Sequence, residues 1–232
     1  KKLLKKDGYF IFEVQYLKDI IDKKIIGTFF HEHMNHYSVT SLENFFNNNG
    51  LFLFDVDRVN IQKGSIIGYV CHKGYLNKKS KKLIQIIKME KNIGLDKVTS
   101  IGKIKKIVTD NKKKATEIIK RKYKNKIICG FGAARSGALL AINYGFENKI
   151  KYIFDDHNLK VNKYSEINNS KVLSSNKIST INPDLCIVLA YIHSRKIVRN
   201  NFQKIRNGLD FMILYPYPKL INYKNINKFL KK

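Results

Sequence analysis

The chain has 232 residues, enough for one large domain or two small ones with a real apolar core. Its net charge of +27 comes almost wholly from lysines spread from end to end, whereas proteins that read nucleic acid favour the planar fork of arginine. Composition therefore argues against specific nucleic-acid binding, but nonspecific polyanion binding and a basic lining for a phosphate-bearing small molecule stay open.

Membrane spans and disulfide frameworks are not expected either. No stretch approaches the ~20 apolar residues of a membrane span. The basic start leads into a strand-like segment instead of the apolar helix of a signal peptide. Cys71, Cys129 and Cys186 lie far apart, each in or beside an apolar stretch. We predict that these cysteines are buried thiols in a cytoplasmic protein.

Residues 1–79 are predicted to form a unit of short strands and helices. The expected elements, in order, are a helix end at 1–6, a strand at 9–14, a helix at 17–22, a helix at 42–48 capped by residues 38–41, and strands at 51–59 and 65–71. Residues 80–124 are basic and place apolar side chains at helical spacing, so they are predicted to be a helical connecting segment.

Residues 125–218 alternate between apolar strands and helices, a pattern typical of a parallel α/β sheet. Strands are expected at 127–131, 150–154, 184–190 and 211–215, and helices at 134–144 and 194–207. Residues 219–232 form a basic tail, expected to be a short terminal helix or to fray. The predicted fold class is therefore α/β.

A glycine-rich turn at residues 130–137 (GFGAARSG) follows the first strand of this second part. Such a turn lets backbone N–H groups approach a phosphate at a helix N-terminus, and Arg135 can add its guanidinium to the same anion. The spacing does not fit a Walker loop and fits the dinucleotide fingerprint only loosely. Asp155 and Asp156 follow at about the position of a ribose-binding carboxylate, so a dehydrogenase fragment and a turn that serves only packing both stay open.

A second cluster lies at residues 29–33 (FFHEH). Half of the chain's six histidines lie between His31 and His36. Two imidazoles beside a carboxylate suit proton transfer near neutral pH. No third strong ligand follows at a recognisable spacing, so no metal site is predicted. The histidines expected to be structural are His36, His72, His157 and His193.

Both motifs occur in one known family. Residues 7–14 and 26–39 resemble the catalytic region of bacterial sugar C-methyltransferases, and residues 130–137, 154–160 and 163–165 are similar to the C-terminal domain of the same enzymes. The resemblance implies that residues 1–79 are the C-terminal part of a class I methyltransferase-like sheet. The helical segment would join it to a Rossmann-like parallel α/β domain that binds a nucleotide-sugar. Family members transfer a methyl group from S-adenosylmethionine to a carbon beside a ketone on a nucleotide-linked sugar.

The resemblance also implies roles for single residues. It makes His33 the base or proton shuttle, Glu32 its partner and His31 a supporting residue. The residues implied in substrate binding are Tyr37, Gly132, Ala133, Ala134, Arg135, Ser136, Asp155 and Asp156. The turn that holds S-adenosylmethionine would lie upstream of residue 1, so we expect a fragment that binds the cofactor poorly and is inactive alone.

Two positions depart from the family pattern. Phe30 stands where the family usually has tyrosine, and Ile67 stands where it commonly has arginine. These differences keep a second hypothesis open, in which the chain is part of a non-catalytic nucleotide-sugar-binding protein.

Overall fold

The structure is a computed structural model that describes residues 1–30 and 32–231. The chain divides into two compact units. The first unit comprises Lys1–Ile25 and His33–Lys105, and the second comprises Ile26–Glu32 and Lys106–Lys232. The short segment that carries Glu32 therefore belongs to the second unit, although the chain on both sides of it belongs to the first.

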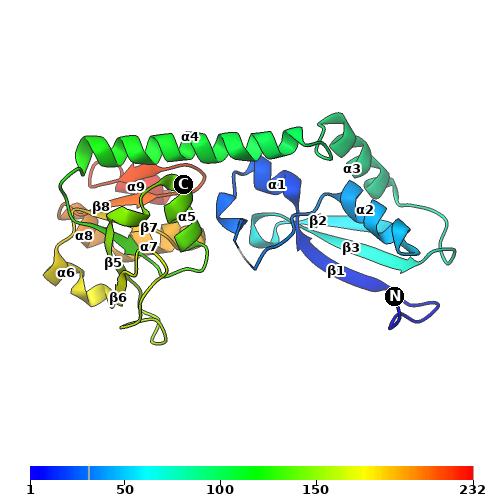
Figure 1. Cartoon of the computed structure of the whole chain (residues 1–232), viewed down its shortest axis with the longest axis horizontal. Helices are drawn as coiled ribbons and strands as arrows, with labels where there is room; N and C mark the ends of the chain where they lie inside the picture. Colours follow the sequence, from blue (N-terminus) through cyan, green and yellow to red (C-terminus); the bar gives the residue numbers. More distant parts are fainter. Residues whose placement is uncertain (31, 232) are drawn as a thin grey trace. The chain divides into compact units, whose positions relative to one another are not determined.

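A three-stranded antiparallel sheet forms the centre of the first unit (Figure 1). Its strands are β1 (Phe10–Gln15), β2 (Leu51–Val59) and β3 (Ser65–His72), ordered β1-β3-β2. The helices of this unit are α1 (Leu17–Asp22), α2 (Val39–Asn48) and α3 (Lys81–Asn92). Helices α2 and α3 pack on β2 and on each other, which buries Leu42, Val56, Ile66, Val70 and Leu83 in one core.

Two sets of hydrogen bonds stabilise the N-terminus of α2. Ser38 caps the helix, because its hydroxyl accepts the backbone N–H of Ser41 while the Ser41 hydroxyl accepts the N–H of Ser38. The carboxylate of Glu90, a fully buried residue of α3, accepts the N–H of Val39 at 2.8 Å and of Thr40 at 2.7 Å. A buried negative charge is stable here because it lies at a helix N-terminus and is hydrogen-bonded.

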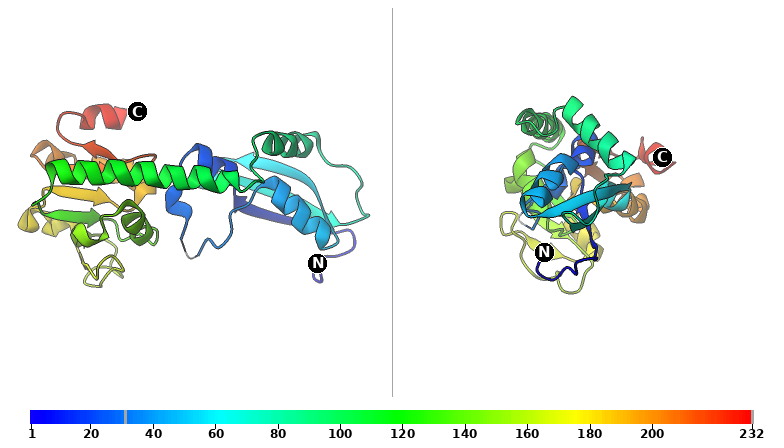
Figure 2. Two further views of the ribbon diagram at one scale, coloured as in Figure 1. Left: turned by 45° about the horizontal axis from the view of Figure 1, so that its top comes forward. Right: turned by 90° about the vertical axis from the view of Figure 1, so that its right-hand side faces the viewer.

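A six-stranded sheet forms the centre of the second unit, and Figure 2 shows it from two further sides. Its strands are β4 (Ile128–Phe131), β5 (Ile150–Phe154), β6 (Lys171–Leu173), β7 (Leu185–Val188), β8 (Asp210–Ile213) and β9 (Lys219–Ile221). They are ordered β6-β5-β4-β7-β8-β9, and β9 runs antiparallel to its neighbour whereas the others are parallel. The helices are α5 (Gly137–Tyr144), α6 (Ile178–Ile181), α7 (Ser194–Asn200), α8 (Phe202–Arg206) and α9 (Ile226–Lys231).

The long helix α4 (Thr99–Lys122) contributes its first residues to the first unit and the remainder to the second. None of the helices in the described part is long and apolar enough to cross a membrane.

The central strands of the second unit are fully buried, as the apolar runs predicted. Cys129 of β4 and Cys186 of β7 are direct neighbours in the register of the two strands. Burial raises the pKa of the Cys129 thiol to about 11 and that of Cys186 as well, which keeps both thiols protonated. Cys71 is also buried, so the prediction of buried thiols is confirmed.

The α/β class is confirmed, and several expected elements are wrong in detail. Lys1–Lys6 form turns and not a helix end, because Leu3 is fully exposed and no apolar stripe is buried there. The connecting segment breaks between α3 and α4 at Gly94, whose φ is +65°. The helix expected at 194–207 divides at Asn201 into α7 and α8. Strands β6 and β9 and helix α6 were not predicted.

We expect Glu90→Gln to lower the free energy of unfolding of the first unit by about 2–4 kcal/mol, because an amide nitrogen would face backbone donors in a buried site. Denaturant titration followed by circular dichroism measures the loss. Asp96→Asn is the matched control, since it removes a carboxylate from an exposed position and should change stability by under about 0.5 kcal/mol. Equal losses in the two variants would contradict the role given to Glu90.

Candidate functional site

The candidate site lies where the direction of the sheet's connections reverses. From β4 the chain passes through α5 to β5 on one side, whereas β7 passes through α7 and α8 to β8 on the other. In open parallel sheets, the loops that diverge at such a point leave room for a ligand at the carboxyl ends of the strands. The glycine-rich turn after β4 and the loop after β7 meet at this edge.

The glycines of this turn serve close packing against the loop after β7. Gly132 has φ +86°, and a Cβ there would lie 2.5 Å from the Cβ of Ala190. Added Cβ atoms at Gly130 and Gly137 would lie 2.6 Å and 3.0 Å from side-chain atoms of Leu189. The packing hypothesis therefore accounts for these glycines.

Asp155 holds the turn from the neighbouring strand. Its carboxylate accepts the backbone N–H of Ala133 at 2.7 Å and that of His157 at 2.8 Å. The Asp156 carboxylate accepts the N–H and hydroxyl of Ser175 at 2.9 and 2.8 Å. Both carboxylates predicted to bind substrate thus have partners inside the protein, and their substrate contacts stay a prediction.

The backbone donors of the turn fall into two groups. The N–H groups of Gly132, Ala133, Ala134 and Gly137 are hydrogen-bonded within the second unit. Among the described residues, the N–H groups of Arg135 and Ser136 find no acceptor. Only this end of the turn, just before α5, has backbone donors left for an anion.

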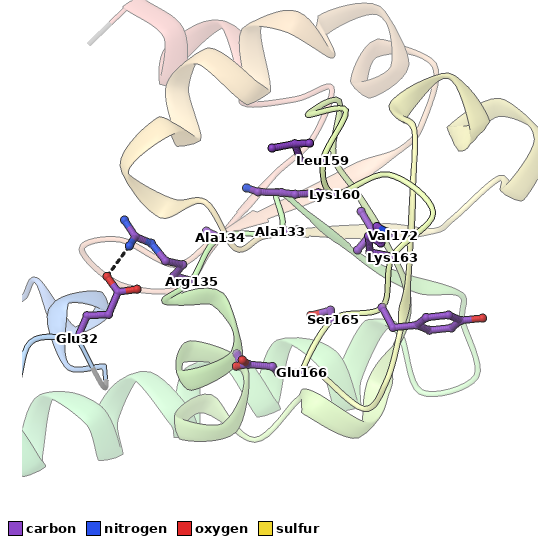
Figure 3. A pocket seen from close by; sticks show the side chains of 12 residues that line it. Glu32, Ala133, Ala134, Arg135, Leu159, Lys160, Lys163, Ser165, Glu166 and Val172 are labelled. Carbon is purple, nitrogen blue, oxygen red and sulfur yellow. Dashed lines mark hydrogen bonds and ion pairs between the residues drawn. The ribbon is translucent and has the colours of Figure 1, made fainter.

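A cavity of about 400 Å³ opens beside these donors. Its lining residues are Glu32, Ala133, Ala134, Arg135, Ala138, Leu159, Lys160, Lys163, Tyr164, Ser165, Glu166 and Val172. Figure 3 shows Lys160 extending toward the turn at Ala133 and Ala134, and its ammonium lies 3.6 Å from the carboxylate of Asp155. Arg135, Lys160 and Lys163 place three cationic side chains in the lining beside the carboxylates of Glu32 and Glu166, and Tyr164 adds an aromatic ring.

Glu32 reaches the same cavity from the short segment that belongs to the second unit. Its carboxylate forms an ion pair with the guanidinium of Arg135, and the two side chains point toward one another in Figure 3. The segment is anchored at Gly27, where a Cβ would lie 2.2 Å from the ring of Tyr191. Tyr191 is buried, which raises its pKa to about 12, and its ring packs against Gly27.

His33 and His36 lie in the first unit. His33 and His36 are half-buried, with ring centroids 6.4 Å apart. Burial lowers the pKa of His36, and the neighbouring His33 lowers it further. The backbone carbonyl of Tyr37 accepts the N–H of Leu17 at 2.8 Å. His31 lies outside the described residues, so its supporting role stays a prediction.

An ion pair between the exposed Arg58 and the buried Asp19 lies at the end of β2 in the first unit. Arg58 donates from Nε and Nη2 to the Asp19 carboxylate at 2.9 and 2.6 Å. Burial opposes ionisation of Asp19, but the hydrogen bonds from Arg58 and Lys23 outweigh it and lower its pKa. Gly64, between β2 and β3, packs directly on Asp19. Ile67, which stands where the resembled C-methyltransferases commonly have arginine, pairs with Glu13 of β1 and Asp57 of β2.

Comparison with known proteins decides the family. The family described as C-methyltransferase C-terminal domain matches residues 60–216. The chain belongs to this family. C-methyltransferase NovU of Streptomyces niveus is 24% identical over 222 residues, which are 95% of this chain and 53% of that protein. The chain thus spans about half the length of the curated relative it matches, and the predicted resemblance to C-methyltransferases is confirmed.

Some residues of this C-methyltransferase C-terminal domain were missed as site residues. Lys160, Lys163 and Tyr164 line the cavity, although only their contribution to the family resemblance was noted. Their spacing after Asp155 was the available signal, but it was hidden by the abundance of lysine. The contact between Gly27 and Tyr191 has no local signal, because 164 positions separate the two residues in the sequence.

We expect Gly132→Ala to destabilise the C-methyltransferase C-terminal domain by about 1–3 kcal/mol more than Gly208→Ala. Both glycines have positive φ, so both substitutions strain the backbone, but a Cβ at Gly208 meets nothing within 4 Å. Thermal and denaturant unfolding of the two variants measure the difference. Equal losses of stability in the two variants would mean that the loop carrying Ala190 moves to accommodate the new methyl group.

Proposed function

We propose that this chain is the C-terminal portion of an S-adenosylmethionine-dependent C-methyltransferase whose substrate is a nucleotide-linked sugar. In this proposal the methyl group is added to a carbon beside a ketone. The observation that carries it is the cavity beside the turn after β4, which three cationic side chains line, in a chain that belongs to the C-methyltransferase C-terminal domain family.

The cavity suits the anionic part of such a substrate. A nucleotide-linked sugar carries a diphosphate, and phosphate oxygens accept hydrogen bonds from guanidinium, ammonium and backbone N–H groups. Arg135, Lys160, Lys163 and the backbone donors at Arg135 and Ser136 supply all three kinds of donor at one edge of the sheet. Tyr164, with 64% of its surface exposed, offers a ring on which a base can stack.

In the proposed reaction, a base removes a proton before the methyl group is transferred. Carbon beside a ketone becomes nucleophilic only after its proton is removed, which leaves an enolate whose oxygen carries negative charge. His33 is proposed to take this proton, and Glu32 is its neighbour in the chain. S-adenosylmethionine would supply the electrophilic methyl group.

The described residues of the first unit do not form a cradle for that cofactor. Strand β1 passes to α1 directly through Tyr16, which is fully buried, and α2 and α3 begin at Ser38 and Ser80, whose side chains cap them. No glycine-rich turn joins a strand to a helix in the described part of this unit. We therefore assign cofactor binding mainly to residues that are not among these 232.

An exposed apolar edge supports a larger sheet around the first unit. β1 is an edge strand, yet Phe10 is 46% and Ile11 58% exposed. Such edges are usually covered or charged in soluble sheets, because unpaired strand edges promote association. Further strands of a methyltransferase domain beside β1 would cover this edge.

We expect His33→Ala in the complete protein to lower kcat for methyl transfer by about 10²–10⁴-fold, because the substrate loses its base. A radiolabelled methyl-transfer assay with a keto nucleotide-sugar measures it. His36→Ala is the matched control: it removes a neighbouring half-buried imidazole and should cost less than about tenfold. Unchanged turnover of the His33 variant would rule out His33 as the base.

Titration calorimetry of this chain with S-adenosylmethionine is expected to give no stoichiometric binding at micromolar protein concentration. The complete protein should bind the cofactor under the same conditions. Tight one-to-one binding by the 232-residue chain would contradict the assignment of the cofactor site to other residues.

A further inference from the structure

Arg135 has two uses that compete with one another. Its guanidinium pairs with the Glu32 carboxylate, and it also lines the cavity proposed for the substrate diphosphate. Carboxylate and phosphate oxygens compete for the same N–H donors of a guanidinium. The ion pair engages Nη1 of the guanidinium, so an anion that binds Arg135 through this nitrogen has to displace Glu32.

The ion pair is well placed for such an exchange. The Arg135 side chain is 73% exposed and the Glu32 side chain 37%, and exposed ion pairs contribute little to stability. A diphosphate carries more negative charge than a carboxylate and would also meet Lys160 and Lys163. Breaking the ion pair therefore lowers the stability of the protein only slightly. Binding the diphosphate adds contacts to Lys160 and Lys163.

The start of the segment that carries Glu32 is held in place by its contacts, so the release of Glu32 from Arg135 changes only the end of the segment. Gly27 is held against the Tyr191 ring, and the 3-10 turn Ile26–Thr28 packs on α5, the helix that follows Arg135. The N–H of Phe30 donates to the carbonyl of Thr28 at 3.1 Å. Glu32 thus follows an anchored turn, and its side chain can leave Arg135 while the anchor stays in place.

We propose that Arg135 is a positioning residue for Glu32, which it holds before the substrate binds and releases when the substrate diphosphate takes its place. This inference rests on the proposed function, because it identifies the competing anion as the substrate's diphosphate. Glu32 precedes His33, the proposed base, so binding of the substrate is coupled to release of the carboxylate that assists proton transfer.

A double-mutant cycle with inorganic pyrophosphate as the probe tests the exchange. Calorimetry on the full 232-residue chain at constant ionic strength measures the Kd of the parent, E32Q, R135Q and the double variant. We expect E32Q to tighten binding about fivefold when Arg135 is present, and by less than about 1.5-fold when R135Q is present. E166Q is the matched control, because Glu166 lines the same cavity, and its effect should be equal in both backgrounds.

The outcomes separate this inference from the proposed function. If pyrophosphate binds but E32Q tightens it equally with and without Arg135, Glu32 acts only as a nearby negative charge and the exchange is overturned. If neither the parent nor E32Q binds pyrophosphate, the cavity is not a diphosphate site. The proposed replacement of Glu32 by the diphosphate is then overturned as well. Coupling confined to the pair of Glu32 and Arg135 supports the exchange. Circular dichroism checks that each variant is folded.

Discussion

The arrangement of the candidate site depends on the carboxylate of Asp155. Strands β4 and β5 end side by side, and Asp155 ties the turn after β4 to the turn that begins at His157 through two backbone hydrogen bonds. Hydrogen bonds to a charged group contribute about 1.5–3 kcal/mol each. Because the turn is held from inside the protein, its shape does not depend on a ligand, and Arg135 projects from backbone that is already in place.

A second constraint brings a carboxylate to this preformed turn. Glu32 and Arg135 lie 103 positions apart in the sequence, yet they meet because the segment that carries Glu32 packs on the second unit. The contact between Gly27 and the Tyr191 ring has no room for a side chain, so only glycine permits this packing. By their contacts, Glu32 belongs to the second unit and His33 to the first.

Much of the fold was predictable because its signals are local. Helix α1 has the predicted bounds, and the apolar runs of β4, β5 and β7 predicted buried parallel strands. Strands β6 and β9 have only three residues each, and their pairing depends on neighbours distant in the sequence. The turns at Lys1–Lys6 were misjudged because charge and periodicity alone do not say whether a side chain is buried.

The glycine-rich turn predicted from the sequence lies beside the candidate cavity. Its spacing could not tell whether Asp155 faces a ligand or the backbone of its own protein. Lys160 and Lys163 were overlooked because lysines occur throughout a chain of net charge +27, so no single lysine stands out. Salt screens charges beyond about 10 Å, so the diffuse lysines act weakly at the cavity. This site therefore differs from the rest of the basic surface in the planar guanidinium of Arg135. Glu32 competes with an anionic ligand for that group.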